Sequence, residues 1–461
     1  MGLLDALSTG ARGLAVASAG INVTTQNVTG AGTEGFSRRS LRTSQLDPVQ
    51  QGGLWIGQGA TASAVARSAD RLLGVRLVDA TGAQSSAATL SDSLSVVESW
   101  FGTGSTTGLA EALDGWFDAL GQSTVDPSDA SLRRGVVTAA EGLATVVSRM
   151  ASGLADASLT YDEQISANIV EVNGMLAEVA SLNGAIGKSG ATTGPADLLD
   201  RRDQLLVSLA EKCGATAELR ADGQAVVMIG GHAVVSGPEA RSLVASTDDD
   251  GRVAVHVSVD EGELDVTSQV GGQVGGLVAA RELVEGWIDD LDSFAYGFAT
   301  AVNTQHALGY DQSGTAGGDL FLAPASSEGA AAAMAVSAAI AGDPALLAFA
   351  GAATALAGDG DNLEALLELE DDTITFGGAT ARAVLSGLVA DVGSQVAAAD
   401  AEAESESARL ADLETLRDSI SGVDTDEEAT HLLEYQAAYR AAARVVSAAD
   451  ELLRQLLAIG G

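Results

Sequence analysis

The residue types that most often perform chemistry are few in this chain and lie far apart. One cysteine, Cys213, can form neither an intramolecular disulfide nor a thiolate cluster for zinc or iron and sulfur. The four histidines show no HExxH pattern or other paired-ligand spacing, so a structural role is favoured over metal ligation. They are His232, His256, His306 and His431. We therefore predict no catalytic residue, no metal site and no cofactor-binding residue.

Two glycine-rich segments superficially resemble ligand loops. GGQVGG at 271–276 lacks the lysine and the glycine spacing of phosphate-binding fingerprints and is interpreted as a tight turn before a helix. DQSGTAGGD at 311–319 lacks the EF-hand ligand positions and is interpreted as a loop. Acidic pairs such as Asp371 and Asp372 lie in a polar run typical of solvated surface. Without a nucleophile motif, an enzyme is not expected.

Charge and length restrict the kinds of partner. The 461 residues suffice for two to four domains, and 63 acidic against 24 basic residues give a net charge of −39. Such a surface repels nucleic acid and anionic membranes. The most apolar tract, 329–358, is interrupted by Asp343 and Pro344, so it is not expected to span a bilayer. MGLLDALSTG is not a conventional secretory signal, and any export must use another route.

Both ends of the chain show helical periodicity with a heptad-like stripe. Two such helices would most simply pack on each other, although periodicity does not exclude separate packing on a globular domain. We expect the apolar stripe residues to form an assembly interface. They are Leu4, Leu7, Leu14, Ile21 and Val28 near the N-terminus, and Leu432, Tyr435, Tyr439, Val446, Leu453 and Leu456 near the C-terminus.

The interior reads as helices, then strands, then helices. Asp126 and Pro127 favour the start of a long helix, with Asp129 at the positive end of its dipole. From Thr216 the period changes to two, and the alternating valines of 253–259 predict a strand with one buried face. Helical periodicity returns after 276, with a small hairpin expected at TITFGGAT, residues 373–380.

These patterns predict an α+β fold, mainly α, that is elongated, with long helices and a terminal coiled coil and with one small antiparallel β-domain inserted. Three domains are expected. Residues 1–45 and 425–461 form the terminal coiled coil, residues 46–213 and 277–424 form a helical rod with small hairpins, and residues 214–276 form an outer β-domain. The molecule is expected to be hairpin-shaped, with both termini at one end and the β-domain at the far end.

Several segments resemble a known family. INVTTQNVTGAGTEGFSRRS, residues 21–40, is similar to the signature of flagellar rod, hook and hook-associated proteins, with Gln26 and Phe36 where asparagine and tyrosine are usual. Residues 108–136, 183–211, 301–321 and 419–446 more specifically resemble the hook-associated protein 1 (FlgK) family. The outer domain of that family is often larger than the segment 214–276 allows.

The resemblance implies a structural subunit of the bacterial flagellum that forms the junction between hook and filament and is needed for filament assembly. It implies contacts with further copies of the chain in a helical ring, with the hook protein and with the second junction protein, hook-associated protein 3. It also implies an export chaperone that binds the C-terminal helix, and secretion by the flagellar export apparatus to an extracellular location. The alternatives are another axial protein (hook, distal rod or flagellin-like) or, least expected, an enzyme on a helical stalk.

Overall fold

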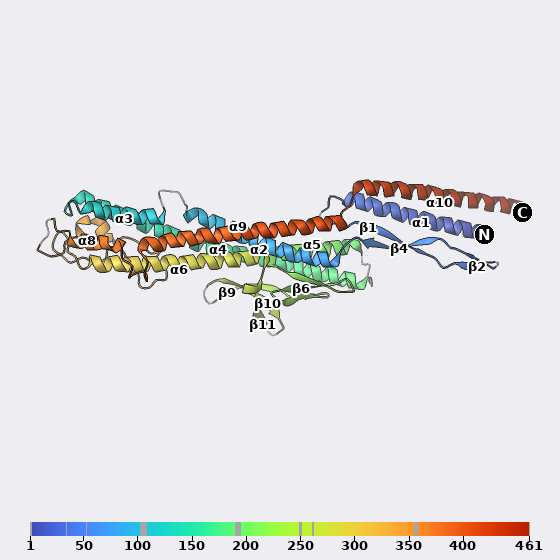
Figure 1. Ribbon diagram of the computed structural model, residues 1–461. Helices are drawn as coiled ribbons and strands as arrows, with labels where there is room; N and C mark the ends of the chain where they lie inside the picture. Colours follow the sequence, from blue (N-terminus) through green and yellow to red (C-terminus); the bar gives the residue numbers. More distant parts are fainter. Residues whose placement is uncertain are drawn as a thin grey trace.

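The chain forms one long, narrow molecule in which helices run almost its whole length (Figure 1). The computed structural model describes residues 2–33, 35–51, 53–101, 108–189, 195–248, 251–260, 262–354 and 358–460. Long helices dominate, and the strands form small antiparallel sheets. The predicted class, α+β and mainly α, is confirmed, and both termini lie at the same end of the molecule.

The terminal end is a pair of antiparallel helices flanked by a ribbon. Helix α1 (Leu3–Gly30) packs along α10 (Thr425–Gly460). A long hairpin folds back along α1, and the Arg12 guanidinium donates to the Gln58 carbonyl at 2.8 Å. Its base pairs β1 (Arg39–Gln45) with β4 (Ala60–Arg67), and its tip pairs β2 (Val49–Gln51) with β3 (Leu54–Ile56). We call α1, β1–β4 and α10 the terminal unit.

The face of α1 that meets α10 is made of small residues and lies one position before the predicted stripe. Gly10, Ala17 and Gly20 are buried there, with Val446 beside Gly10 and the Tyr435 ring beside Gly20. This heptad runs Leu3, Ala6, Gly10, Gly13, Ala17, Gly20, Thr24, Asn27. The predicted mutual packing of the end helices is confirmed, but the predicted contact face of α1 was wrong. Small side chains allow the two backbones to approach closely. A contact face predicted from hydrophobicity does not include such residues, because glycine and alanine carry little apolar surface.

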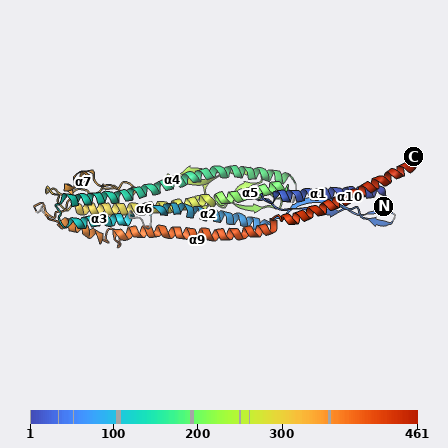
Figure 2. The same ribbon diagram turned by 90° about the horizontal axis from the view of Figure 1, so that it is seen from above.

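The rod consists of long helices packed side by side (Figure 2). Helices α2 and α9 pack together, as do α4 and α6. Their bounds are α2 (Arg71–Phe101), α3 (Leu109–Ser123), α4 (Ala130–Lys188), α5 (Ala196–Cys213), α6 (Gly272–His306) and α9 (Ala381–Ser421). The helices expected before and after the strands are confirmed, and Leu94, Leu113 and Trp116 are buried in the core of the rod.

The N-terminus of α4 differs from the predicted one by a single turn. Asp129, not Asp126, is the N-cap, and its carboxylate accepts from the amides of Ser131 and Leu132 at 2.7 and 3.0 Å. Asp126 instead accepts from the Ser128 amide at 3.0 Å, in the turn before the helix. Since two aspartates lie three residues apart around one proline, sequence alone did not show which of them would be the cap.

The β-domain lies along the half of the rod that is nearer the terminal unit, not at the far end as predicted (Figure 1). One sheet has the order β5-β6-β7-β8 and the other β11-β10-β9. The strands are β5 (Thr216–Leu219), β6 (Ala225–Ile229), β7 (His232–Ser236), β8 (Glu239–Ala240), β9 (Leu243–Thr247), β10 (Val253–Val259) and β11 (Gly262–Asp265), followed by a 3-10 turn, η1 (Thr267–Gln269). Val255 and Val257 are fully buried, as the alternation predicts. Helices α4 and α6 both extend from the domain to the distal end of the rod. The chain segment that forms the β-domain therefore leaves the rod at its side and not at its far end.

The end of the rod away from the termini, the distal end, is held by an aromatic cluster. Trp116 lies edge-on to Phe298 with ring centroids 5.4 Å apart, and Phe298 stacks on Phe294 at 5.6 Å. The surrounding chain is mostly loop, with α7 (Ala338–Gly342), η2 (Pro344–Leu346), α8 (Asp361–Leu367) and η3 (Glu368–Glu370). Residues 373–380 form turns with a single β-bridge between Phe376 and Ala379. The hairpin predicted there is therefore wrong, because no β-strands form in this segment.

The three-domain division stays a prediction, but two of its boundaries can be compared with elements. The boundary at 45/46 falls inside the hairpin, between β1 and its partner β4. The boundary at 213/214 coincides with the end of α5, where Gly214 adopts φ +64°. GGQVGG lies against this corner. Gly271 and Gly272 turn into α6, while Gly276 meets the backbone of α2, so the glycines allow close packing as well as a turn.

Candidate assembly surface and its attachment to the rod

The eleven predicted interface residues all lie on the terminal unit, at different depths. Leu4, Val28, Tyr439 and Leu456 are exposed. The other seven are half-buried: Leu7, Leu14, Ile21, Leu432, Tyr435, Val446 and Leu453. Because the closest contact of the pair is made by the small-residue heptad, the α1 stripe lies at the edge of the helix pair, where its side chains are only partly covered.

Further large apolar side chains are exposed on the terminal unit. Leu54 and Trp55 at the hairpin tip are 71% and 69% exposed. Helix α10 adds Leu433, Val445, Leu452 and Leu457. No terminal-unit residue belongs to the main core, which begins at Val78, and the fully covered apolar residues of the unit are only Ala17, Val23 and Ala449 among those described. The unit therefore buries little apolar surface within one chain.

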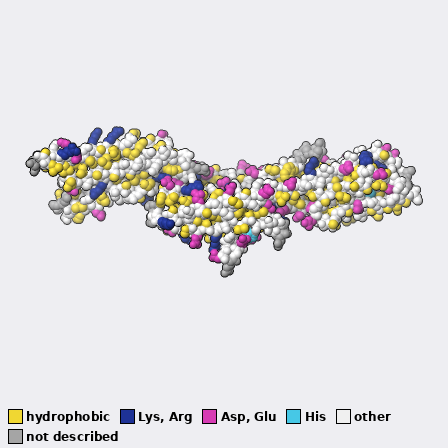
Figure 3. Space-filling model, turned by 180° about the vertical axis from the view of Figure 1, so that it is seen from behind, with side chains coloured by type: hydrophobic (Ala, Val, Ile, Leu, Met, Phe, Trp, Pro, Cys, Tyr) yellow, Lys and Arg dark blue, Asp and Glu magenta, His cyan; other side chains and the backbone are white. Residues whose placement is uncertain are grey.

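The strong acidity of the chain is absent from this unit. Residues 1–67 and 425–461 hold nine acidic and eight basic residues, against 63 and 24 in the whole sequence. Seen from behind, apolar side chains gather over the terminal end, while acidic ones are spread over the rod (Figure 3). Like charges repel at close range, so a nearly neutral surface can pack against copies of itself with less repulsion than the acidic rod surface.

A buried polar joint connects α1 to α10. The Asn27 amide donates to Glu428 Oε2 at 2.9 Å and to the Arg39 carbonyl at 2.8 Å, and its oxygen accepts from the Arg39 amide at 2.9 Å. Arg38 Nε donates to the other oxygen of Glu428 at 2.8 Å. Asn27 and Glu428 are 1% and 2% exposed, so these partners satisfy groups that water cannot reach.

A second cluster attaches the base of the hairpin to α5 of the rod. Arg39 pairs with Asp197 and Asp200 at 2.5 and 3.2 Å. Arg67 pairs with Asp200 at 2.8 Å and with Asp203 at 2.7 Å. Since each arginine reaches two carboxylates on successive turns of α5, the cluster fixes both the position and the direction of the hairpin.

Electrostatics explain why these groups occur together. Burial raises the pKa of Asp200 above its ordinary value, against the opposing effects of Arg67 and Arg39. Burial acts to lower the pKa of Arg38, but its hydrogen bonds with Glu428 and Glu427 outweigh this and raise it. A buried charge without partners is strongly destabilising, so each member of the joint depends on the others.

Sequence reasoning did not predict these contacts. In the sequence, Asp197, Asp200 and Asp203 alternate with arginines in a pattern typical of a charge-paired helix start, and Glu428 lies near a helix start, where the dipole favours anions. Their partners lie more than 130 residues away, at Arg39, Arg67 and Arg38. The available signal was the Ser-Arg-Arg turn after α1, because adjacent arginines in an acidic chain require nearby carboxylates.

No group of three or more His, Cys, Asp or Glu side chains among the described residues could hold a metal ion, and none of their helices is long and apolar enough to cross a membrane. Cys213 is buried, and burial raises the pKa of its thiol to about 12. The His306 ring lies between the Gly318 carbonyl and the Ala348 amide, at 2.6 and 2.9 Å. Both side chains have a structural role.

Comparisons with known proteins point to the axial proteins of the bacterial flagellum. The model of the flagellar hook-associated protein FlgK helical domain matches residues 94–321. A second model, the C-terminal part of flagellar basal body rod FlgEFG proteins, matches residues 417–459. The first match covers most of the rod and the β-domain, and the second covers α10.

Individual relatives carry one name. Flagellar hook-associated protein 1 of Escherichia coli strain K12 is 28% identical over 319 residues, which cover 67% of this chain and 58% of that protein. The Bacillus subtilis protein of that name is 26% identical, covering 98% of this chain and 97% of its own. The aligned part thus spans little more than half of the E. coli relative. A solved structure, the flagellar hook junction protein FlgK from Burkholderia pseudomallei, superposes with a TM-score of 0.67 at 16% identity, covering 75% of this chain and all of that one.

These findings support the flagellar hook-associated protein 1 (FlgK) family as the family that this chain resembles.

Proposed function

We propose that this chain is a structural subunit of the bacterial flagellum that forms the junction between hook and filament and is needed for filament assembly. The resemblance supports this role, since the relatives are named hook-associated protein 1. The observation that carries the mechanism is the terminal unit, which is nearly neutral and exposes apolar side chains in an otherwise acidic molecule. Such a surface is stabilised only when neighbouring subunits cover it.

The assembly interface follows from this arrangement. The eleven stripe residues are exposed or half-buried, so neighbouring copies can cover them, although Tyr435 and Val446 also contact Gly20 and Gly10 of their own copy. The small-residue heptad of α1 holds the helix pair together within each copy. Copies packed in this way form a helical ring, with the end helices lining the inner tube and the acidic rod facing outward. The three-domain division then has a functional meaning: a terminal coiled coil for assembly, a rod for reach and an outer β-domain on the solvent side.

The proposed partners are the hook protein below the ring and hook-associated protein 3 above it, beside further copies of the chain. Helix α10 binds an export chaperone before secretion, because its exposed Leu433, Leu452 and Leu457 would otherwise associate prematurely. The flagellar export apparatus then delivers the chain to the extracellular flagellum. The role is structural and not enzymatic.

The basal body rod match of residues 417–459 favours a second candidate, a different axial protein. That match is confined to the last helix and its approach, however, while the FlgK helical-domain match covers 94–321. Every tube-forming subunit would need this last helix, so the match of residues 417–459 does not distinguish one axial protein from another. The match that covers the rod and β-domain favours the junction protein.

Deletion of the gene distinguishes the candidates. Cells without the chain should keep complete hooks but carry no filaments, and they should release flagellin monomers into the medium. Electron microscopy of the cell surface and immunoblots of the medium give the two readings. Loss of the hook would favour a hook or rod protein, and normal filaments would contradict the proposal.

A further inference from the structure

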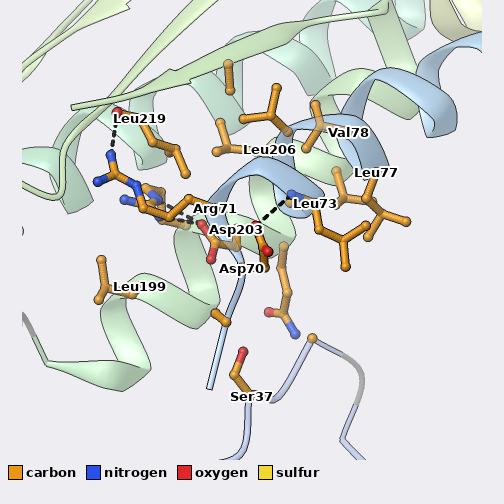
Figure 4. Close-up of a pocket in the computed structure, with 18 of the residues that line it drawn as sticks. Ser37, Asp70, Arg71, Leu73, Leu77, Val78, Leu199, Asp203, Leu206 and Leu219 are labelled. Carbon is orange, nitrogen blue, oxygen red and sulfur yellow. Dashed lines mark hydrogen bonds and ion pairs between the residues drawn. The ribbon is translucent and has the colours of Figure 1, made fainter. Parts of the chain in front are cut away.

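A cavity of about 520 Å³ lies where the rod meets the terminal unit. Its wall is apolar and comes from three elements, with Leu73, Leu77 and Val78 on α2, Leu206 on α5 and Leu219 on β5 (Figure 4). Four of these side chains, those of Leu73, Leu77, Val78 and Leu206, are almost fully buried. The size and lining suit the binding of one or two large apolar side chains.

The rim of the cavity is rich in arginine, although four of its arginines, Arg67, Arg201, Arg202 and Arg417, are paired with carboxylates. Six arginines line it, with only three carboxylates. The arginines are Arg67, Arg71, Arg201, Arg202, Arg220 and Arg417, and the carboxylates are Asp70, Asp203 and Glu211. The Arg71 guanidinium donates to the carbonyls of Leu219 and Arg220 at 2.5 and 2.8 Å, which are neutral acceptors. Within the described parts of the chain, neither Arg71 nor Arg220 forms an ion pair, so the rim retains positive charge.

A complementary segment occurs on the distal half of the rod. We call residues 368–374, with the sequence ELEDDTI, the acidic loop. Ile374 is 91% exposed, more than any other large apolar side chain among the described residues. No lysine or arginine occurs between Asp343 and Ala381, so the loop is uniformly acidic.

The loop is held in shape by its own contacts. Asp372 accepts from the Ile374 amide at 2.9 Å and from the Thr375 hydroxyl at 2.5 Å. Next to it, Phe376 stacks on Phe294 of α6, with ring centroids 5.8 Å apart. A fixed loop loses less conformational entropy on binding than a flexible one, which favours its use as a recognition element.

We propose that the acidic loop of one copy docks in the arginine-rimmed cavity of a second copy, with Ile374 against the leucine wall. The loop cannot reach its own cavity, because Phe376 fixes it to the distal half of α6 while the cavity lies at the opposite end of the rod (Figure 1). The contact is head-to-tail, the type that generates rings or helical arrays. This inference rests on the proposed function and assigns to the rods a contact of their own.

Co-expression of two singly substituted copies, Gly74→Cys and Ile374→Cys, tests the contact. Gly74 lines the cavity, and a Cβ added there meets nothing within 4 Å, so the substitution leaves the wall intact. The native thiol, Cys213, is fully buried and does not compete. Mild oxidation of isolated flagella should give a disulfide-linked dimer. Gly142→Cys on α4, also open to solvent, replaces Gly74→Cys in the matched control and should give none.

Charge reversal provides a second reading that needs no cysteine. Arg71→Glu should weaken the junction so that filaments detach at lower shear, and Asp371→Arg in the same chain should restore them. Absence of the dimer from flagella that carry normal filaments, or equal shear resistance of all variants, would overturn the loop contact and leave the junction role standing. Absence of the chain from isolated hooks and filaments would overturn the proposed function itself.

Discussion

At the scale of single residues, the terminal unit depends on side chains that are small enough to be overlooked. Gly10 and Gly20 allow α10 to approach α1 so closely that a methyl group would overlap Val446 or the Tyr435 ring. Asn27 and Glu428 then fix the register of the pair at its base. Leucines and isoleucines are left at the edges, where a neighbouring subunit can cover them.

Gly20→Ala should impair assembly although alanine is the better helix former. The new Cβ would lie 2.4 Å from the Tyr435 ring, so the helices must separate, which outweighs the helix-propensity gain of about 1 kcal/mol. The fraction of cells with filaments should fall. Gly13→Ala is the matched control, because its Cβ would lie 3.3 Å from Ala442 and can be accommodated. Equal filament counts in both strains would contradict the close-approach account.

The stability of the distal end should depend on pH through His306. Burial lowers the pKa of this ring, with Arg133 acting in the same direction and the Gly318 carbonyl and Asp319 opposing. Protonation of Nε2 would also break its bond with the Ala348 amide. The folded state therefore prefers the neutral ring. Its stabilising contribution is complete above the unfolded pKa of about 6.5 and is lost as the pH falls below it, by at most about 1.4 kcal/mol per unit.

Urea unfolding at pH 8, 7, 6 and 5 measures this dependence. The difference in unfolding free energy between the native chain and His306→Gln should be largest at pH 7 to 8 and should shrink toward pH 5. A His306→Gln difference that grows on acidification would reverse the assigned sign.

At the scale of elements, periodicity was a good guide wherever one helix or strand buries one face. The seams of α2, α3 and α6 and the buried valines of β10 could be predicted, because apolar spacing determines which face is covered. The contact face of α1 could not, since glycine carries no hydrophobic signal. Contacts between elements distant in sequence, such as the ion pair of Arg67 with Asp203, could not be predicted either. A pattern of charged residues does not show which opposite charge will lie beside each of them in the fold.

The terminal helices should be weakly protected in the free monomer. The contact face of α1 consists largely of glycine, alanine and polar residues, and a helix that buries so little apolar surface is marginally stable in water. Hydrogen exchange followed by mass spectrometry should show fast exchange of residues 5–28 in dilute monomer and slow exchange of the buried turns of α4. Assembly into flagella should slow the exchange of residues 5–28. Strong protection of this segment in the monomer would contradict the account.

At the scale of the whole molecule, charge and apolar surface are separated along the long axis. The rod and β-domain carry nearly all of the net charge of −39, while the terminal unit is close to neutral. The elongated shape and the position of both termini at one end could be predicted from the nesting of helices around strands. The position of the β-domain could not, because it depends on how far α4 and α6 extend past it.

The most direct test of the central claim is filament assembly in cells that produce Ile21→Asp. An unpaired charge on the stripe of α1 would cost several kcal/mol once neighbouring subunits bury it. The rod and β-domain are remote from this residue and should stay folded, and the same result is expected for Leu14→Asp. Leu159→Asp, at an exposed leucine on α4, is the control and should leave filaments normal. The account predicts normal export of Ile21→Asp, no filaments and flagellin monomers in the medium. Motile cells with normal filaments would show that the terminal helices are not the assembly surface.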